Sequence, residues 1–185
     1  MTISICDPNP EWPAHFAQLK SAILQAAPAG SVIHHIGSTA IPGLAAKNVI
    51  DIQLTVNDMA SVNCAAIERQ GFIERPGLVD HCPPGLSLPK DDLRKLFFRG
   101  TGRRAHLHIR ERGRFNQRFA LLCRDYLRSH PTAAGAYALI KRRLADRFPE
   151  NDDAYYDIKD PVFDIIMDGA NDWARLVGWS LPSGD

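Results

Sequence analysis

The sequence predicts an α+β core followed by a helical C-terminal part. Two observations lead to this prediction. Short runs rich in Val and Ile alternate with helical patterns up to about residue 112, and only helical periodicity follows. The chain of 185 residues is also long enough to bury a core of its own. We therefore expect one domain over residues 1–185, with the strands in about 1–112 and helices in about 113–185.

The first half of the chain reads as alternating helix and strand. A helical pattern opens at Pro10 and stops at Pro28, because proline suits the first turn of a helix and interrupts a later one. Runs rich in β-branched residues and bounded by turn formers predict strands. The elements expected next are strands at 31–36 and 48–56, a helix from Asp58 to Gln70, and a strand at 72–75.

The second half reads as a long loop, a hairpin and three helices. Residues 76–92 hold Pro, Gly, His and Cys without a period, and loops of this length often serve as lids or binding loops. Residues 95–99 and 105–110 predict a hairpin across the turn GTGRR. The expected helices begin after Gly113, at Pro131 and at Pro161, the last with Asp160 as its cap.

Composition argues against a membrane or secreted protein. No apolar run approaches the ~20 residues that a membrane span requires. The N-terminus lacks the basic start and apolar segment of a signal peptide. The four cysteines are scattered without a CxxC pair, which favours a reduced protein over a disulfide framework. We expect a cytoplasmic protein that has no membrane partner.

Charge is distributed unevenly along the chain, although the net charge is only +1. Residues 99–147 hold thirteen Lys and Arg against three acids, whereas residues 148–185 hold nine acids and two bases. A basic segment of this kind is typical of proteins that bind a polyanion such as nucleotide phosphate or RNA. The alternative is that the two segments form neighbouring helices that neutralise each other. Composition leaves both interpretations open.

Asp51 lies in the middle of the apolar strand VIDIQLTV, where an ionised carboxylate is costly unless a metal or cation pairs with it. Strand alternation places Asp51 and Gln53 on one face. In the later strand AHLHIRE, His106, His108 and Arg110 likewise share a face. If the strands are neighbours, carboxylate and imidazole form a cluster that suits zinc, manganese or iron. The alternative is a histidine packed in the core with its nitrogens satisfied by the backbone.

Gly37, Ser38 and Thr39 directly follow the first strand. Glycine permits close backbone approach, and two hydroxyls beside free N–H groups suit phosphate oxygens. A helix N-cap is the alternative, because Ser and Thr cap helices routinely. Lys47, four residues before Asp51, is placed either to contact a phosphate or to pair with a surface acid.

The order of these pieces resembles the GrpB family, a divergent branch of the nucleotidyltransferase superfamily. The resemblance covers nearly the whole chain. Its motifs are HIGSTAIPGLAAK at 35–47, VIDIQLTV at 49–56, HLH at 106–108, CRDYLRSHP at 123–131, the pair Tyr137 and Lys141, and Trp12-Pro13. The resemblance implies a nucleotidyltransferase-like fold, which is a mixed β-sheet flanked by helices with further helices at the C-terminal end.

The resemblance also implies a metal site, but the ligands in this chain differ from those usual in the superfamily. Nucleotidyltransferases generally hold two Mg²⁺ ions with an alternating pair of acids and a third acid on a neighbouring strand. Here Asp51 is the first acid, Gln53 takes the partner position, and His106 or His108 takes the third. Gln is a poor Mg²⁺ ligand, and imidazole favours softer metals. We expect one divalent metal, Mg²⁺, Mn²⁺ or Zn²⁺, bound by Asp51, His106 and His108.

Two functions are compatible with this site. The first is a metal-dependent nucleotidyltransferase or phosphate-group hydrolase with Asp51, His106 and His108 as catalytic residues. The second, which Gln53 favours, is a non-catalytic accessory module that binds a nucleotide, RNA or a partner protein. The residues expected to contact the ligand or its phosphates are Gly37, Ser38, Thr39, Lys47, Gln53, Arg103, Arg104, Arg110, Arg124 and Lys141.

Overall fold

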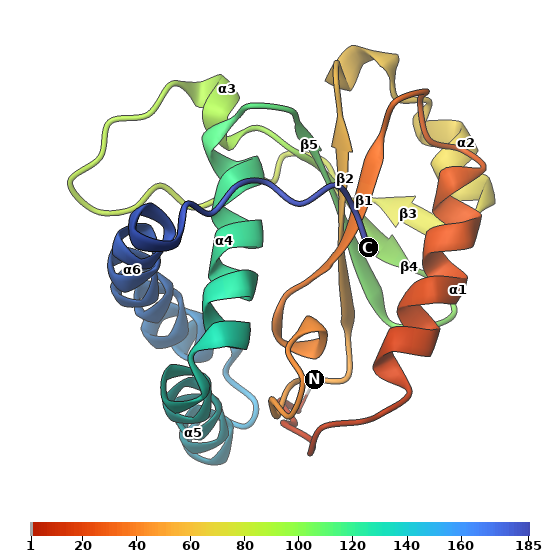
Figure 1. The fold of residues 1–185 in the computed structure, drawn as a ribbon. Coiled ribbons are helices and arrows are strands. Elements are labelled where there is room, and N and C mark those ends of the chain that lie inside the picture. Colours follow the sequence, from red (N-terminus) through yellow and green to blue (C-terminus); the bar gives the residue numbers. More distant parts are fainter. Residues whose placement is uncertain (1) are drawn as a thin grey trace.

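The computed structural model describes residues 2–185 and shows a mixed five-stranded sheet within them (Figure 1). The strand order is β1-β2-β5-β4-β3. Strands β2 and β5 pair in parallel, and every other neighbouring pair is antiparallel. The strands are β1 (Val32–Ile36), β2 (Ile50–Val56), β3 (Phe72–Glu74), β4 (Leu96–Gly100) and β5 (Ala105–Glu111). The expected strands are all formed, and the predicted α+β fold is confirmed.

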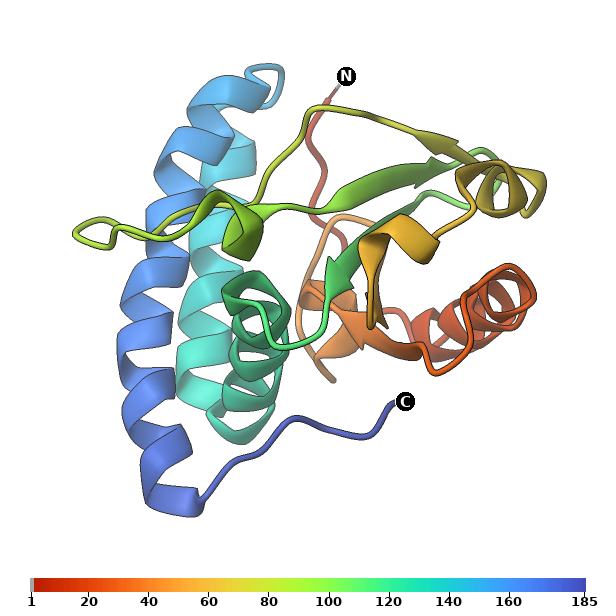
Figure 2. The same cartoon turned by 90° about the horizontal axis from the view of Figure 1, so that it is seen from above.

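Helices cover both faces of the sheet. Helices α1 and α2 lie on one face, whereas α4, α5 and α6 stand on the other (Figures 1 and 2). The α-helices are α1 (Trp12–Leu24), α2 (Cys64–Arg69), α3 (Lys90–Leu93), α4 (Phe115–Ser129), α5 (Pro131–Arg147) and α6 (Asp152–Val177). Two short 3₁₀ turns, η1 (Ser38–Ala40) and η2 (Met59–Ser61), interrupt the connections around β2. None of the helices in residues 2–185 has the length and apolar character that a bilayer crossing requires.

The two faces of the sheet differ in polarity because successive strand residues point to opposite sides. Ile52 of β2 and Leu107 of β5 are fully buried and pack in one cluster with Trp12 and Phe16 of α1. This cluster is the main hydrophobic core. The opposite face carries the polar residues of β2 and β5, so it forms the floor of a site beneath α4, α5 and α6.

The helix expected from Asp58 to Gln70 was predicted with the wrong start. The side chain of Asp58 accepts a hydrogen bond from the backbone N–H of Ala60 and caps η2 instead. The side chain of Asn63 then accepts from the N–H of Ala66 and opens α2. A second capping residue five positions later therefore divides the segment into two short helices.

The last helix begins earlier than the sequence predicts. Asn151, and not Asp160, caps it by accepting a hydrogen bond from the N–H of Ala154, and Pro161 lies inside α6. A proline there removes one helical hydrogen bond. The helix continues because it buries residues such as Met167 and Ala170 in a second core cluster with α4 and α5. Packing along the helix outweighs the local cost of the proline.

Candidate functional site

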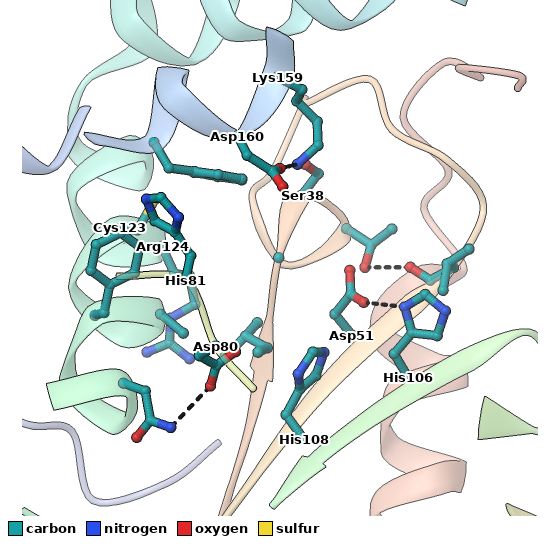
Figure 3. A pocket seen from close by; sticks show the side chains of 18 of the residues that line it. Ser38, Asp51, Asp80, His81, His106, His108, Cys123, Arg124, Lys159 and Asp160 are labelled. Atoms are coloured by element: carbon teal, nitrogen blue, oxygen red, sulfur yellow. Dashed lines mark hydrogen bonds and ion pairs between the residues drawn. The ribbon is translucent and has the colours of Figure 1, made fainter. Parts of the chain in front are cut away.

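A cleft of about 650 Å³ lies between the polar face of the sheet and α4, α5 and α6 (Figure 3). Part of the long loop at 76–92 also lines it, through residues 78–81. Most of the residues predicted from the sequence to form a site line this cleft. They are Gly37, Ser38, Thr39, Lys47, Asp51, His106, His108, Arg110, Arg124 and Lys141.

The structure brings Asp51 and the two histidines together on the cleft floor. The parallel pairing of β2 and β5 sets Asp51 directly beside His106. The Asp51 Oδ1 atom lies 3.0 Å from His106 Nδ1, the hydrogen bond drawn in Figure 3. One ligand atom from each of Asp51, His106 and His108 lies within 4.8 Å of the others. Burial and the nearby charges of Arg110 and Lys95 hold the pKa of His108 well below its usual value, so this imidazole is neutral.

Gly37 allows the turn after β1 to approach Asp51 closely. Its φ is +68° and its ψ is −171°, a conformation that essentially only glycine adopts. A Cβ atom on residue 37 would lie 2.5 Å from Asp51 Oδ2. The turn η1 therefore presents Ser38 beside the carboxylate of Asp51, and the position requires glycine for both its backbone angles and its contact.

Lys141 of α5 reaches the same turn. Its Nζ atom donates to Ser38 Oγ at 2.8 Å and to the backbone oxygen of Ala45 at 2.6 Å. Lys141 is only 3% exposed, and burial followed by the charge of Lys159 lowers its pKa to about 7. Both hydrogen-bond partners are neutral. Within residues 2–185 no acid bonds this amino group directly, although the charge of Asp51 favours its protonated form. An anionic group next to Ser38 would stabilise the protonated form further.

Two further lysines line this end of the cleft. The Nζ atom of Lys47 donates to the Tyr156 hydroxyl at 3.2 Å and lies 4.2 Å from the Tyr155 ring centroid. Lys159 lies on α6 and donates to Asp160 Oδ1 at 2.5 Å. The two lysines and both tyrosines line the cleft with Lys141. This end of the cleft is thus built from the β1–β2 connection, α5 and α6.

Lys159 and Asp80 also line the cleft, although the sequence patterns did not predict either as a site residue. Lys159 belongs to the acidic C-terminal segment, which composition does not associate with a phosphate. Its spacing of four residues from Tyr155 was an available signal, because residues at this spacing share one helix face. Asp80 lies in an aperiodic loop, and no sequence pattern places such a residue relative to a sheet.

Asp80 joins the long loop to the cleft floor. Its carboxylate accepts from Arg110 Nε at 2.7 Å, Lys95 Nζ at 2.7 Å and Asn116 Nδ2 at 3.0 Å. Arg110 also donates from Nη1 to Gln53 Oε1 at 2.6 Å. Arg110 and Gln53 are thus held in a network of protein partners, and Gln53 lies beneath Arg110 and outside the cleft lining.

We expect replacement of Asp80 by Asn to alter the acid stability of the protein. Burial raises the pKa of this carboxyl, but Arg110 and Lys95 outweigh that effect and hold it well below its usual range. Its folded pKa is thus lower than the unfolded value of about 3.9, so its stabilisation is present above that pH and is lost as the pH falls below it.

The Asp80→Asn variant should lose about 2 kcal/mol of unfolding free energy at neutral pH. It should then lose less further stability than the wild type between about pH 4 and pH 2. Urea unfolding at a series of pH values measures both effects, with the exposed Asp172→Asn as the matched control. Parallel acid profiles for the wild type and Asp80→Asn would contradict this role.

Two more of the predicted site residues, Thr39 and Arg124, form hydrogen bonds within the protein that stabilise the walls of the cleft. Thr39 is buried and donates to the backbone oxygen of Val49 at 3.2 Å. Arg124 donates to the backbone oxygen of His35 at 3.0 Å and to Asp125 Oδ1 at 2.8 Å.

Arg103 and Arg104 lie outside the cleft lining. Arg103 donates to the backbone oxygen of Asn48 at 2.9 Å. Both arginines belong to the turn between β4 and β5. Burial lowers the pKa of Lys47, and Arg104 lies close enough that its charge, like that of Lys159, lowers this pKa further.

The basic and acidic segments do become neighbours, because α6 lies along α4 and α5 (Figure 2). Direct neutralisation between them is limited. Among the salt bridges of residues 2–185, Arg124–Asp185 joins a base of the first segment to an acid of the second. Other arginines of the basic segment pair elsewhere, as Arg114 does with Glu111. The two segments therefore lie side by side with little direct pairing between them.

Fold and site together define an α+β protein with a polar cleft between a mixed sheet and a helical C-terminal part. This chain belongs to the GrpB family, because the family profile described as GrpB protein matches residues 2–169. The crystal structure of conserved protein GrpB from Enterococcus faecalis superposes with a TM-score of 0.76 and 28% sequence identity. That comparison covers 92% of this chain and 99% of the other.

Two curated relatives are longer than this chain. A dephospho-CoA kinase from Mycolicibacterium paratuberculosis is 32% identical over 96% of this chain and 48% of its own length. The UPF0157 protein YqkA from Bacillus subtilis is 32% identical over 90% of this chain and 47% of its own length. The chain thus spans about half the length of these relatives.

Proposed function

We propose that this chain is a nucleotidyltransferase-like protein whose cleft binds a nucleotide or another phosphorylated ligand. In this proposal Ser38 and Lys141 bind the phosphate, and Asp51, His106 and His108 hold one divalent metal. The observation that carries the proposal is the buried amino group of Lys141, whose two hydrogen-bond partners within residues 2–185 are both neutral. A phosphate oxygen beside Ser38 would supply a direct counter-charge and form a charge-assisted hydrogen bond.

The rest of the cleft suits the remaining parts of such a ligand. Lys47 extends the positive charge beyond Lys141, as a further phosphate group would require, whereas Lys159 is paired with Asp160. Phe119 of α4 and Phe163 of α6 add aromatic surface to the lining. Ligand pockets commonly combine an apolar wall with a few placed polar groups. A nucleotide has this combination, with a flat base at one end and phosphates at the other.

A divalent metal at Asp51, His106 and His108 fits the donor chemistry of the cluster, since carboxylate and neutral imidazole are common metal ligands. Such an ion supplies charge stabilisation at a phosphoryl oxygen or an activated water. The chain's own groups bind and orient the ligand. Lys141 and Ser38 hold a phosphate, and Gly37 keeps that phosphate site next to Asp51.

A non-catalytic accessory module is the second candidate. It is supported by Gln53, which stands where a second catalytic acid is expected and is already bonded to Arg110. In that case the same cleft binds a nucleotide, RNA or a partner protein without turnover. For both candidate functions we place the protein in the cytoplasm. The proposal is supported by the cysteines of the described residues, none of which forms a disulfide.

Turnover of labelled nucleotides distinguishes the two candidates. The full chain is incubated with a panel of nucleoside triphosphates and Mg²⁺, Mn²⁺ or Zn²⁺, and release of phosphate or pyrophosphate is measured. For an enzyme, we expect Asp51→Asn to lower the rate by roughly 100-fold or more, because metal catalysis contributes several kcal/mol. Asp168→Asn, on the exposed side of α6, is the control.

The same panel is followed by calorimetry to separate binding from chemistry. Binding without turnover in the wild type would support the accessory module. Turnover that survives in Asp51→Asn would contradict catalysis through Asp51. A wild type that binds no phosphorylated ligand would exclude the enzyme and would leave the accessory module only with a partner protein as its ligand.

A further inference from the structure

We infer that the cluster of Asp51, His106 and His108 is built for a single transition-metal ion of the Zn²⁺ type, and not for a pair of Mg²⁺ ions. This inference rests on the cation site of the proposed function and assigns its metal class. It depends on three features of the cleft floor: the chemistry of the donors, the fixed amide of Gln53, and the guanidinium of Arg110.

The donors favour a borderline metal over a hard one. The three groups offer one carboxylate oxygen and two imidazole nitrogens, all within 4.8 Å of one another. Imidazole suits Zn²⁺ and its first-row neighbours, whereas Mg²⁺ demands six oxygen ligands at near-ideal octahedral positions. Three protein ligands also leave one position of a tetrahedral ion open, as in catalytic zinc sites.

Gln53 provides no ligand for a second ion. Its side chain is fully buried, its Oε1 accepts from Arg110 at 2.6 Å, and its Nε2 donates to the backbone oxygen of Gln117 at 3.0 Å. Both ends of the amide are therefore committed to protein partners. Freeing the oxygen for a metal would leave buried donors unpaired, which is unfavourable in the protein interior.

Arg110 places a positive charge next to the cluster. Its side chain is only 6% exposed, and its Nε and Nη2 atoms donate to the Asp80 carboxylate at 2.7 and 2.9 Å. The Nη2 atom lies 3.4 Å from His108 Nδ1. A second divalent ion on this side of the cluster would face a fixed guanidinium, and repulsion between like charges is strong at low dielectric. The three ligands can offset this repulsion for one ion, whereas Gln53 supplies no ligand that would offset it for a second.

Metal titration of the full chain tests this assignment. Metal-stripped wild-type protein is titrated with Zn²⁺, Co²⁺ or Mg²⁺ by calorimetry without nucleotide, and the visible absorption of the Co²⁺ form is recorded. We expect one Zn²⁺ per chain, a Co²⁺ spectrum typical of nitrogen and oxygen ligands, and no displacement of Zn²⁺ by millimolar Mg²⁺.

Substitutions locate the ion. His106→Asn, His108→Gln and Asp51→Asn should each weaken Zn²⁺ binding by about 100-fold or more, since even indirect metal partners contribute 10–100-fold. His81→Gln, a histidine of the same cleft outside the cluster, should bind Zn²⁺ like the wild type. Circular dichroism verifies folding, and the competition between Zn²⁺ and Mg²⁺ in the wild type requires no variant.

Two ions per chain, displacement of Zn²⁺ by Mg²⁺, or undiminished Zn²⁺ binding in the folded cluster variants would overturn the inference. Nucleotide binding is measured separately in a chelator. If ATP binds through Lys141 and Zn²⁺ does not bind, the metal assignment fails and the phosphate cleft stands. If Zn²⁺ binds at the cluster and no nucleotide binds, the metal assignment stands and the proposed ligand fails.

Discussion

Replacing Lys141 with Met should lower the affinity for a nucleoside triphosphate by roughly 100-fold, because a charge-assisted hydrogen bond contributes about 1.5–3 kcal/mol. The fold should survive the change. Lys141 is almost fully buried, and Met fills a similar volume without a desolvated charge. Calorimetric titration with ATP in a chelator measures the loss without any contribution from a metal.

Arg143 provides the matched control, because it lies two residues further along α5 and is exposed. Arg143→Gln also removes one positive charge from the same helix, so it reports the general electrostatic attraction alone. We expect its affinity to fall only slightly, by an amount that salt screens. Equal losses in the two variants would show that Lys141 makes no specific contact with the phosphate.

Gly37→Ala should have the largest effect on stability, with a loss of about 3 kcal/mol or more in the free energy of unfolding. Two causes act together. The backbone angles of residue 37 are strained for any other residue, and the new Cβ atom would lie 2.5 Å from Asp51 Oδ2. Asp51 would have to move, so ligand and metal binding should be lost as well. Denaturant unfolding and zinc titration measure the two effects.

Gly43→Ala separates the effect of backbone strain from that of a steric clash between the new Cβ atom and its neighbours. Gly43 also has a positive φ, of +74°, but a Cβ atom there would meet nothing within 4 Å. This variant should lose only ~1 kcal/mol and keep its binding properties. A Gly37→Ala protein as stable as Gly43→Ala would mean that the turn does not press against Asp51.

The strands were predictable because their signal is local. Val and Ile runs between turn formers, such as 48–56, fix the strand whatever surrounds it. Helix ends were less predictable where neighbouring signals compete. Asn63 caps α2 although Asp58 precedes it, and Pro161 is tolerated inside α6 because packing on α4 and α5 decides the outcome.

The cleft floor could also be foreseen in part. Alternation in β2 and β5 puts Asp51 and His106 on equivalent faces, and only the pairing of the two strands had to be assumed. The cleft wall could not be foreseen in the same way. Lys159 reaches the cleft through the position of α6, and Asp80 through an aperiodic loop held by Arg110. Both depend on tertiary contacts that no local pattern encodes.

The place where a bound phosphate lies decides whether the cleft has the role we propose. A crystal structure of the full chain with a non-hydrolysable ATP analogue gives this position directly. We expect a phosphate oxygen within about 3 Å of both Lys141 Nζ and Ser38 Oγ. A nucleotide bound elsewhere, or one whose phosphates turn away from Lys141, would contradict the proposal.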